Sequence, residues 1–232
     1  MRRTRVTIAA LALSAVAAVS AQRLAFTPPR LLTADLSPLP APTIVGGGEV
    51  LIEATVDRTG KVTRPSILRG TPPYTNMVLD ALATWRFEAA SVRSIDGRDE
   101  PVDMPIAIAA LYRAPVLMNA PTIGEVPKDW SKPSGEVAYP IAMEMPNYPP
   151  TARDGGVVLL EVKLNEAGAV TETRGVASVG GFDSAARDAL AQWRFRAGTY
   201  RSRPVPTTAY VLFGFRQPVV SSPRLPVPPP KR

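Results

Sequence analysis

The sequence predicts an α+β protein built from two tandem small ββαβ modules, each a three-stranded antiparallel sheet packed on a helix. Two observations lead to this fold class. One stretch of sequence recurs at a constant offset of 108 residues. Within each copy the spacing of apolar residues changes from a period of two to a period of 3.6. A chain of 232 residues has room for two such small units.

The repeat holds one register, without a gap, from residue 47 to residue 90 of the first copy. Beyond it, the first copy carries five additional residues before Pro101 meets Pro204. One register kept over this distance indicates a duplication rather than two unrelated segments of similar pattern. The closest matches pair residues 47–53 with 155–161 and residues 80–87 with 188–195.

Each copy begins with a predicted hairpin. Apolar and polar residues alternate along residues 50–56 and again along 158–164, as in a half-buried strand. Both runs end in an Asx-x-x-Gly turn, at Asp57 to Gly60 and at Asn165 to Gly168. Glycine accepts the positive φ of a tight turn without steric cost, so a second strand should follow from Val62 and from Val170.

A helix is predicted next in each copy, and a third strand closes the module at 105–112 and at 207–215. Thr75 and Asp183 are suitable N-cap residues where the helical pattern begins. Trp85 and Trp193 end the two patterns and are expected to be core anchors. One helical face should carry Tyr74, Val78, Ala81, Leu82 and Trp85, and the other Phe182, Ala186, Ala189, Leu190 and Trp193.

The N-terminus has the three parts of a secretory signal. Arg2, Arg3 and Arg5 form a positive region, an apolar run follows to Val19, and Val19-Ser20-Ala21 is a small-residue cleavage site. Residues 1–21 are therefore predicted to be a signal peptide that sends the protein to the periplasm. The alternative is an uncleaved anchor in the inner membrane, for which a run of about 16 residues is short.

Composition excludes several kinds of chemistry. The chain has no cysteine and no histidine, so it lacks a thiol nucleophile, a thiolate or imidazole metal ligand and the commonest general base. The net charge of +7 falls to +4 without the leader, which is too small an excess to indicate nucleic-acid binding. We expect no cofactor, no metal site and no enzymatic activity. The paired carboxylates Glu53 with Asp57 and Glu161 with Glu166 are expected to be solvent-side charges on strands and turns.

An ordered set of residues in the second copy resembles the C-terminal domain of the TonB energy transducers. The first copy keeps the strand, the Asp-x-x-Gly turn and the Trp-Arg-Phe triplet but lacks the leading Tyr-Pro-x-x-Ala-Arg, so it is degenerate. The residues that carry the resemblance are Tyr148, Pro149, Ala152, Arg153, Gly156, Asn165, Gly168, Val170, Phe182, Asp183, Ala185, Ala186, Leu190, Trp193, Arg194 and Phe195.

This resemblance implies a periplasmic module that binds an extended peptide of an outer-membrane transporter, or of another envelope protein, by strand addition to its third strand. By position, the partner-binding residues would be the strand edge Thr207, Thr208, Ala209, Tyr210, Val211, Leu212 and Phe213, together with Tyr148, Pro149 and Arg153 of the lead. Self-association through the same strand edges stays open. Pro105 lies in the corresponding strand of the first copy, where it weakens an augmentation edge.

The expected organisation has six parts. They are the signal peptide at 1–21, a proline-rich linker at 22–44, the degenerate module at 45–114, a second proline-rich linker at 115–146, the TonB-like module at 147–217 and a proline-rich tail at 218–232. Trp130 and Tyr139 in the second linker predict that part of it lies against a module. A working transducer would need a membrane helix with a histidine and a longer linker. The alternative function is an atypical, membrane-anchored TonB-type component of outer-membrane transport.

Overall fold

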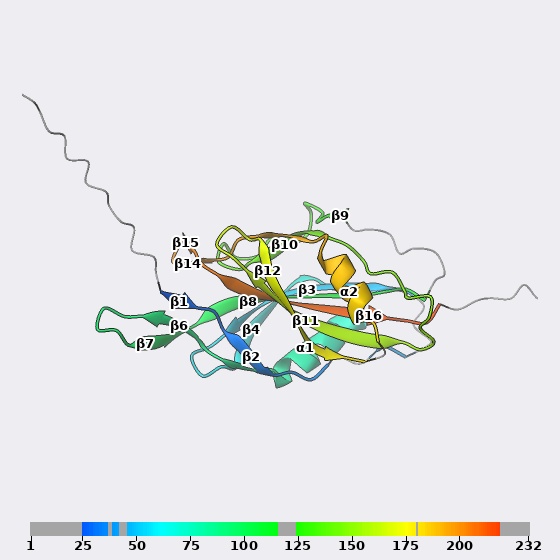
Figure 1. Cartoon of the computed structure of the whole chain (residues 1–232), viewed down its shortest axis with the longest axis horizontal. Helices are drawn as coiled ribbons and strands as arrows, with labels where there is room; N and C mark the ends of the chain where they lie inside the picture. The colour runs from blue at the N-terminus through cyan, green and yellow to red at the C-terminus, as the bar shows by residue number, and fades with distance from the viewer. Residues whose placement is uncertain (1–24, 37–38, 42–45, 116–123, 180, 219–232) are drawn as a thin grey trace, which may run out of the picture.

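A computed structural model describes residues 25–36, 39–41, 46–115, 124–179 and 181–218. The predicted signal peptide at 1–21 and nearly all of the predicted tail at 218–232 lie outside the described residues. The centre of the molecule is one six-stranded sheet in the order β12-β11-β16-β8-β3-β4 (Figure 1). Its strands are β3 (Gly48–Val56), β4 (Val62–Arg69), β8 (Met104–Tyr112), β11 (Gly156–Leu164), β12 (Val170–Ser178) and β16 (Thr207–Phe215).

The two predicted hairpins, β3–β4 and β11–β12, are present. In the first turn Asp57 Oδ1 accepts hydrogen bonds from the backbone N–H groups of Thr59 and Lys61, at 2.8 and 3.1 Å. Asn165 Oδ1 does the same in the second turn, at 2.9 and 3.0 Å. Gly60 and Gly168 both have positive φ, 79° and 80°, as the turn pattern predicts.

Two helices follow the hairpins, α1 (Tyr74–Thr84) and α2 (Asp183–Leu190). Trp85 and Trp193 follow the C-terminal ends of these helices and are buried, as expected of core anchors. The predicted N-caps are wrong: the N-cap positions are Pro73 and Phe182, and neither makes a side-chain capping bond. Thr75 instead lies buried in the first turn of α1, and Asp183 is the first helical residue of α2.

The expectation of two separate three-stranded sheets is corrected by the contact between the halves. Three antiparallel strands do come from each half, β4-β3-β8 and β12-β11-β16. However, β8 and β16 pair in parallel from Ala107–Ala209 to Tyr112–Gly214 and make a single mixed sheet. Both strands are apolar on both faces, and every residue except Pro105 is buried. A strand of this kind belongs inside a sheet that is covered on both sides.

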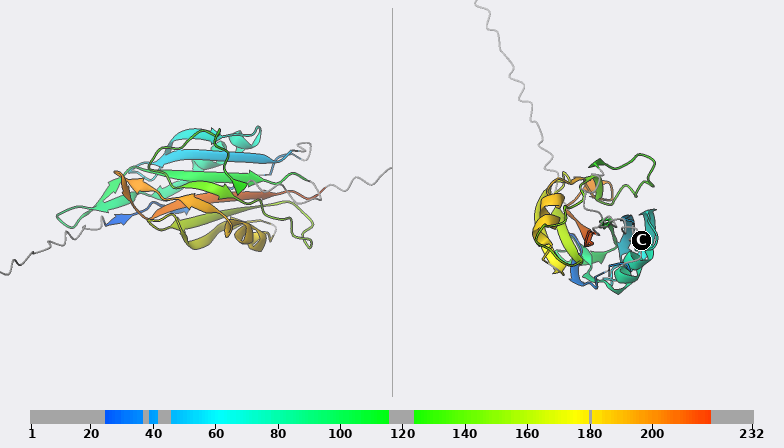
Figure 2. Two further views of the ribbon diagram at one scale, coloured as in Figure 1. Left: turned by 90° about the horizontal axis from the view of Figure 1, so that it is seen from above. Right: turned by 90° about the vertical axis from the view of Figure 1, so that its right-hand side faces the viewer.

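Each face of the sheet carries its own apolar core. On one face, α2 and the segment around Val137 to Met143 cover residues of both halves, including Leu51 and Phe213. On the opposite face, α1 and the segment around Leu31 cover residues of both halves, including Ile52 and Leu212. Figure 2 shows the two helices on opposite sides of the sheet. Because each core draws on both halves, the described chain packs as one body.

Parts of the two predicted linkers are folded, which corrects the expected organisation. Leu31, Val137 and Tyr139 are buried, and Trp130 packs against the core on the α2 face of the sheet, so part of the second linker lies against the folded body as predicted. The strands of these segments are β1 (Phe26–Thr27), β2 (Arg30–Thr33), β9 (Gly124–Glu125) and β10 (Tyr139–Met143). Among them only β10 contains a proline, Pro140, and the pairing of β10 with its neighbour shifts register directly after it.

Short strands complete the fold on either side of the main sheet. β2 pairs with β5, β10 lies between β13 and β9, β6 lies between β1 and β7, and β14 pairs with β15. These partners are β5 (Arg86–Glu88), β6 (Ala90–Arg93), β7 (Asp99–Val102), β13 (Arg194–Arg196), β14 (Thr199–Tyr200) and β15 (Arg203–Pro204). Neither helix in the described part of the chain is long and apolar enough to cross a membrane.

Candidate partner-binding site

The predicted edge strand, Thr207–Phe213, lies in the middle of the sheet. Its strand β16 pairs antiparallel with β11 on one side and parallel with β8 on the other (Figure 1). The expectation of an open edge here is therefore wrong for the folded chain, because both rows of backbone groups already have strand partners. The corresponding strand of the first half, β8, is also internal, between β3 and β16.

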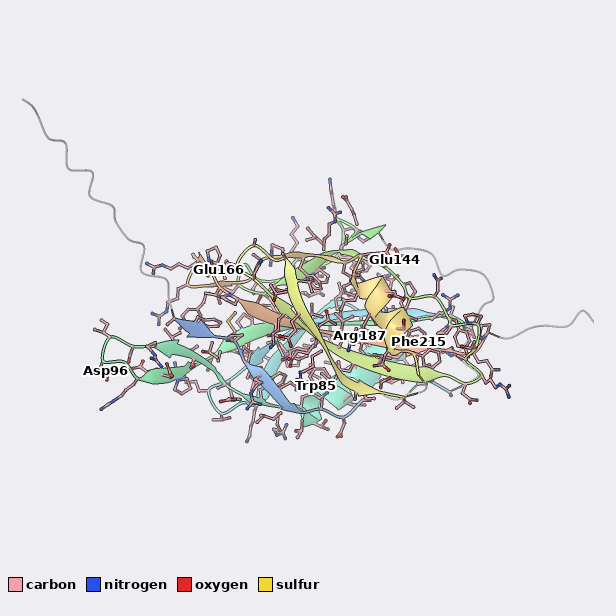
Figure 3. All side chains as sticks on the ribbon, in the orientation of Figure 1. Trp85, Asp96, Glu144, Glu166, Arg187 and Phe215 are labelled. Carbon is pink, nitrogen blue, oxygen red and sulfur yellow. The ribbon has the colours of Figure 1, made fainter. Side chains whose placement is uncertain are left out.

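The side chains of β16 are closed off as well as its backbone. The Tyr210 ring meets Trp85 and Phe87 of the first half edge-on, at 5.5 Å between ring centroids in each case. On the other face, the Phe213 ring meets Trp193 edge-on at 5.7 Å. Trp85 and Phe215, both labelled in Figure 3, belong to the cores on opposite faces of the sheet. Neither face of β16 is left for a partner.

The junction between β8 and β16 depends on a close approach at Gly214. A Cβ atom at this position would lie 2.3 Å from Cδ1 of the buried Tyr112 ring. The backbone N–H of Arg113 donates to the Gly214 carbonyl at 2.8 Å and extends the pairing by one bond. Glycine is thus required here so that the Tyr112 ring can pack on the neighbouring strand.

The remaining predicted site residues lie at the surface, in the segment before β11. Tyr148 is half-buried and packs on Phe182 with 5.6 Å between ring centroids, while its hydroxyl donates to the Asp154 carbonyl at 2.8 Å. Pro149 is half-buried and Arg153 is exposed. Residues 148–153 form no helix; they contain a turn closed by the Ala152 N–H, which donates to the Pro149 carbonyl at 3.1 Å.

This lead segment borders two open hollows. One, of about 410 Å³, is lined by Pro149 and by the polar side chains Ser184, Asp188 and Gln192 on and just after α2. The other, of about 370 Å³, is lined by Arg113 and Gln217, among others. Tyr148 lines both hollows. The lead segment is therefore the part of the predicted site that an extended partner could reach.

Glu161, which was expected to be a solvent-side charge, is buried on β11 opposite Tyr210 of β16. Glu161 is only 3% exposed, and its carboxylate accepts bonds from the Arg174 guanidinium at 3.2 and 2.9 Å. Burial raises the pKa of the Tyr210 hydroxyl well above its ordinary value, and the Glu161 charge raises it further. The alternating pattern of β11 places Glu161 on a face that is solvent-exposed in an isolated module, and the first half covers that face.

The other paired carboxylates have structural roles. Glu53 accepts the backbone N–H of Ser134 at 2.8 Å and also its hydroxyl, which fixes the segment before β10 to β3. Asp57 is held in its turn, and Glu166 is an exposed turn residue. No group of three or more acidic residues that could hold a metal ion occurs among the described residues.

The comparison with protein families finds a match in the second half of the chain. Residues 144–216 match the family model described as the Gram-negative bacterial TonB protein C-terminal. The match begins just before the lead segment and ends one residue beyond β16. No curated protein matches the chain.

Proposed function

We propose that this chain, whose residues 144–216 belong to the TonB C-terminal domain family, binds an extended segment of an outer-membrane receptor or of another envelope protein. Family membership supports a protein-interaction role in the bacterial envelope. The role is binding without catalysis, because Glu53, Asp57 and Glu161 each hold a structural partner rather than face a shared cleft.

The partner is held along the lead segment, at Tyr148, Pro149 and Arg153. The observation that carries this proposal is the contrast within the predicted site. β16 is paired on both edges and buried on both faces, whereas the lead segment borders two open hollows. Strand addition to β16 would require β8 to leave, and β8 contributes residues to the cores on both faces of the sheet. Release of β8 would therefore unfold much of the molecule.

We further propose that the two halves are copies of one module. The strongest support is a matched pair of hydrogen bonds at the ends of the two helices. Trp85 Nε1 donates to the Asp35 carbonyl at 3.0 Å, and Trp193 Nε1 donates to the Glu144 carbonyl at 2.9 Å. β2 and β10 pair with β5 and β13 in the same antiparallel manner. In this view the first half has become the permanent strand partner of the second.

The place of action is the periplasm, reached through the leader at 1–21. In the alternative of a membrane-anchored transducer, only a short chain would connect an anchor at 1–21 to the folded body. The Ala25 carbonyl already accepts the Arg93 N–H at 2.9 Å, so the folded body starts there. Residues 22–24 span about 10 Å when fully extended. The reach of about 60–70 Å expected for a free 20-residue linker is lost, because residues 25–36 are part of the fold.

Site-specific photo-crosslinking tests the proposed surface. A photoreactive amino acid at Arg153 should crosslink in intact cells to an extended segment of an envelope protein, mapped by mass spectrometry of the crosslinked peptide. The same group at Leu32, which is 53% exposed on the first half, is the matched control and should give no such product. A product at Leu32 but not at Arg153 would place the binding surface elsewhere. A product from a group at buried Ile108 would mean that β8 does leave the sheet.

A further inference from the structure

The two outer edges of the main sheet are protected very differently. Pro65 interrupts β4, Arg64 beside it has a φ of 49°, and Arg64 pairs with Asp103 at 3.5 Å. Proline removes a backbone donor and blunts an edge against pairing with another chain. β12 is nine residues long and contains no proline, and in the described part of the chain no strand covers its outer edge. Thr173 occupies the position that Pro65 occupies in the first half, at the repeat offset of 108.

Charges alternate across the strands next to this open edge. Lys163 on β11 is opposite Glu172 on β12, with 2.9 Å between Nζ and Oε2. Two residues along, the order reverses: Glu161 on β11 is opposite Arg174 on β12. The edge strand therefore presents a negative and a positive side chain on one face of the sheet, with Thr173 between them.

We propose that β12 pairs antiparallel with β12 of a second copy of this chain, centred on Thr173. In that register Glu172 of each copy lies opposite Arg174 of the other. Two rows of side chains then cross the interface with alternating charge. Each row consists of Lys163 and Glu172 of one copy followed by Arg174 and Glu161 of the other, and the two rows run in opposite directions. A shift that centres the pairing on Glu172 or on Arg174 would instead place like charges directly opposite each other, which is destabilising. Charge thus favours the register centred on Thr173 over its two neighbours.

Arg187 controls access to this edge. It lies on α2, and its Nη1 donates to the Thr173 carbonyl at 2.8 Å (labelled in Figure 3). A Cβ atom at Gly175 would lie 3.2 Å from its Nη2, so the glycine leaves the space that the guanidinium occupies. The Thr173 carbonyl is at the centre of the proposed interface. The Arg187 side chain therefore occupies a backbone acceptor on the edge of β12, whereas Pro65 removes a backbone donor from the edge of β4.

Sedimentation equilibrium of the full mature chain over a wide dilution series tests the proposal. A reversible dimer is expected. Glu172→Arg should weaken it at least about tenfold, because two like-charged contacts replace two attractive ones. Arg187→Ala should strengthen it by removing the competing donor. Glu166→Arg makes the same charge change in the adjacent exposed turn and should leave the dimer unchanged. A chain that stays monomeric, or a dimer indifferent to Glu172→Arg, would overturn the proposal.

The register has its own test, because the chain contains no cysteine. Thr173→Cys introduces a single thiol, which should lie opposite its own copy across the two-fold axis and form a disulfide-linked dimer under mild oxidation. Ser66→Cys, an exposed position on β4 beside Pro65, is the matched control and should stay monomeric. Circular dichroism confirms that both variants are folded. Equal crosslinking of the two variants, or no crosslinking of Thr173→Cys, would contradict the interface.

Discussion

The two halves of the molecule share one order of elements but use their strand edges in opposite ways. Where the halves meet, the apolar strands β8 and β16 pair in parallel, so neither strand keeps a free edge. At the outside, β4 carries a proline and β12 does not. On our proposal that the two halves are copies of one module, a strand edge of that module has become an internal joint between the copies. We therefore propose that a partner binds elsewhere, along the lead segment at residues 148–153.

The cores show the same asymmetry. The second half buries Glu161 beneath the first half and neutralises it with Arg174, whereas the corresponding Glu53 fixes a chain segment through Ser134. In the two turns an ionisable Asp57 corresponds to a neutral Asn165, and both accept two backbone N–H bonds, while Asp57 also accepts the Thr59 hydroxyl. These matched differences allow the dependence of one half on the other to be measured.

Removal of the first half should have the largest effect. In the fragment 124–218, Val157, Leu159, Tyr210 and Leu212 would lose the cover that they share with the first half. Re-exposure of four such side chains costs about 6–12 kcal/mol, comparable to the whole stability of a domain. We expect a fragment that is unfolded or self-associated, with poor dispersion in its ¹H–¹⁵N NMR spectrum. A well-dispersed monomer would show that the halves are independent.

A smaller change at the joint should still be costly. Gly214→Ala places a Cβ atom against the buried Tyr112 ring and should lower the free energy of unfolding by about 3 kcal/mol, as overpacking does. Gly135→Ala is the control, since a Cβ atom added there would have no neighbour within 4 Å, and it should change stability by less than about 0.5 kcal/mol. Urea denaturation measures both. Equal stability of the two variants would mean that β8 and β16 are not tightly joined.

The buried charge should matter next. Arg174→Ala leaves the Glu161 carboxylate buried without its cation and should cost about 2 kcal/mol, less than for a fully buried pair because the arginine side chain is 46% exposed. Lys163→Ala removes an exposed partner of Glu172 and should cost less than about 1 kcal/mol. Thermal and urea unfolding of the two variants give the comparison. A reversed order would indicate that the first half does not exclude water from Glu161.

The smallest effect is a dependence on pH. The hydrogen bond from the Thr59 side chain, and then that from the Lys61 backbone, lower the pKa of Asp57 below its ordinary value. Its contribution to stability is therefore present above the unfolded-state pKa, about 3.9, and is lost as the pH falls through the lower folded-state pKa. Asp57→Asn should lower stability slightly at pH 7, where the charged form contributes, and should remove this part of the acid-induced loss. Asn165→Asp should add a smaller loss at acid pH to the second half, because Ala167 has no hydroxyl to donate where Thr59 does in the first turn. Unfolding curves from pH 2 to pH 7 would detect either change.

Local features of this fold could be predicted from the sequence, and long-range ones could not. Alternation, the Asx-x-x-Gly turns and helical spacing identified the hairpins, both helices and the buried Trp85 and Trp193. The helix starts were missed because Pro73 and Phe182 supply no capping side chain. The folded parts of the linkers were missed because proline content outweighed single buried residues such as Leu31. A signal for the internal β16 was available, since its run of apolar residues on both faces is typical of a central strand.

Hydrogen exchange of the β16 amides shows whether both edges of this strand are paired. Alternate backbone N–H groups of a strand point to opposite neighbours, so one set in β16 faces β11 and the other faces β8. With both edges paired, every amide from Ala209 to Phe215 should exchange slowly, near the rate set by global unfolding. If the edge toward β8 were open to a partner, every second amide would exchange fast while those between were protected. That alternating pattern would contradict the account.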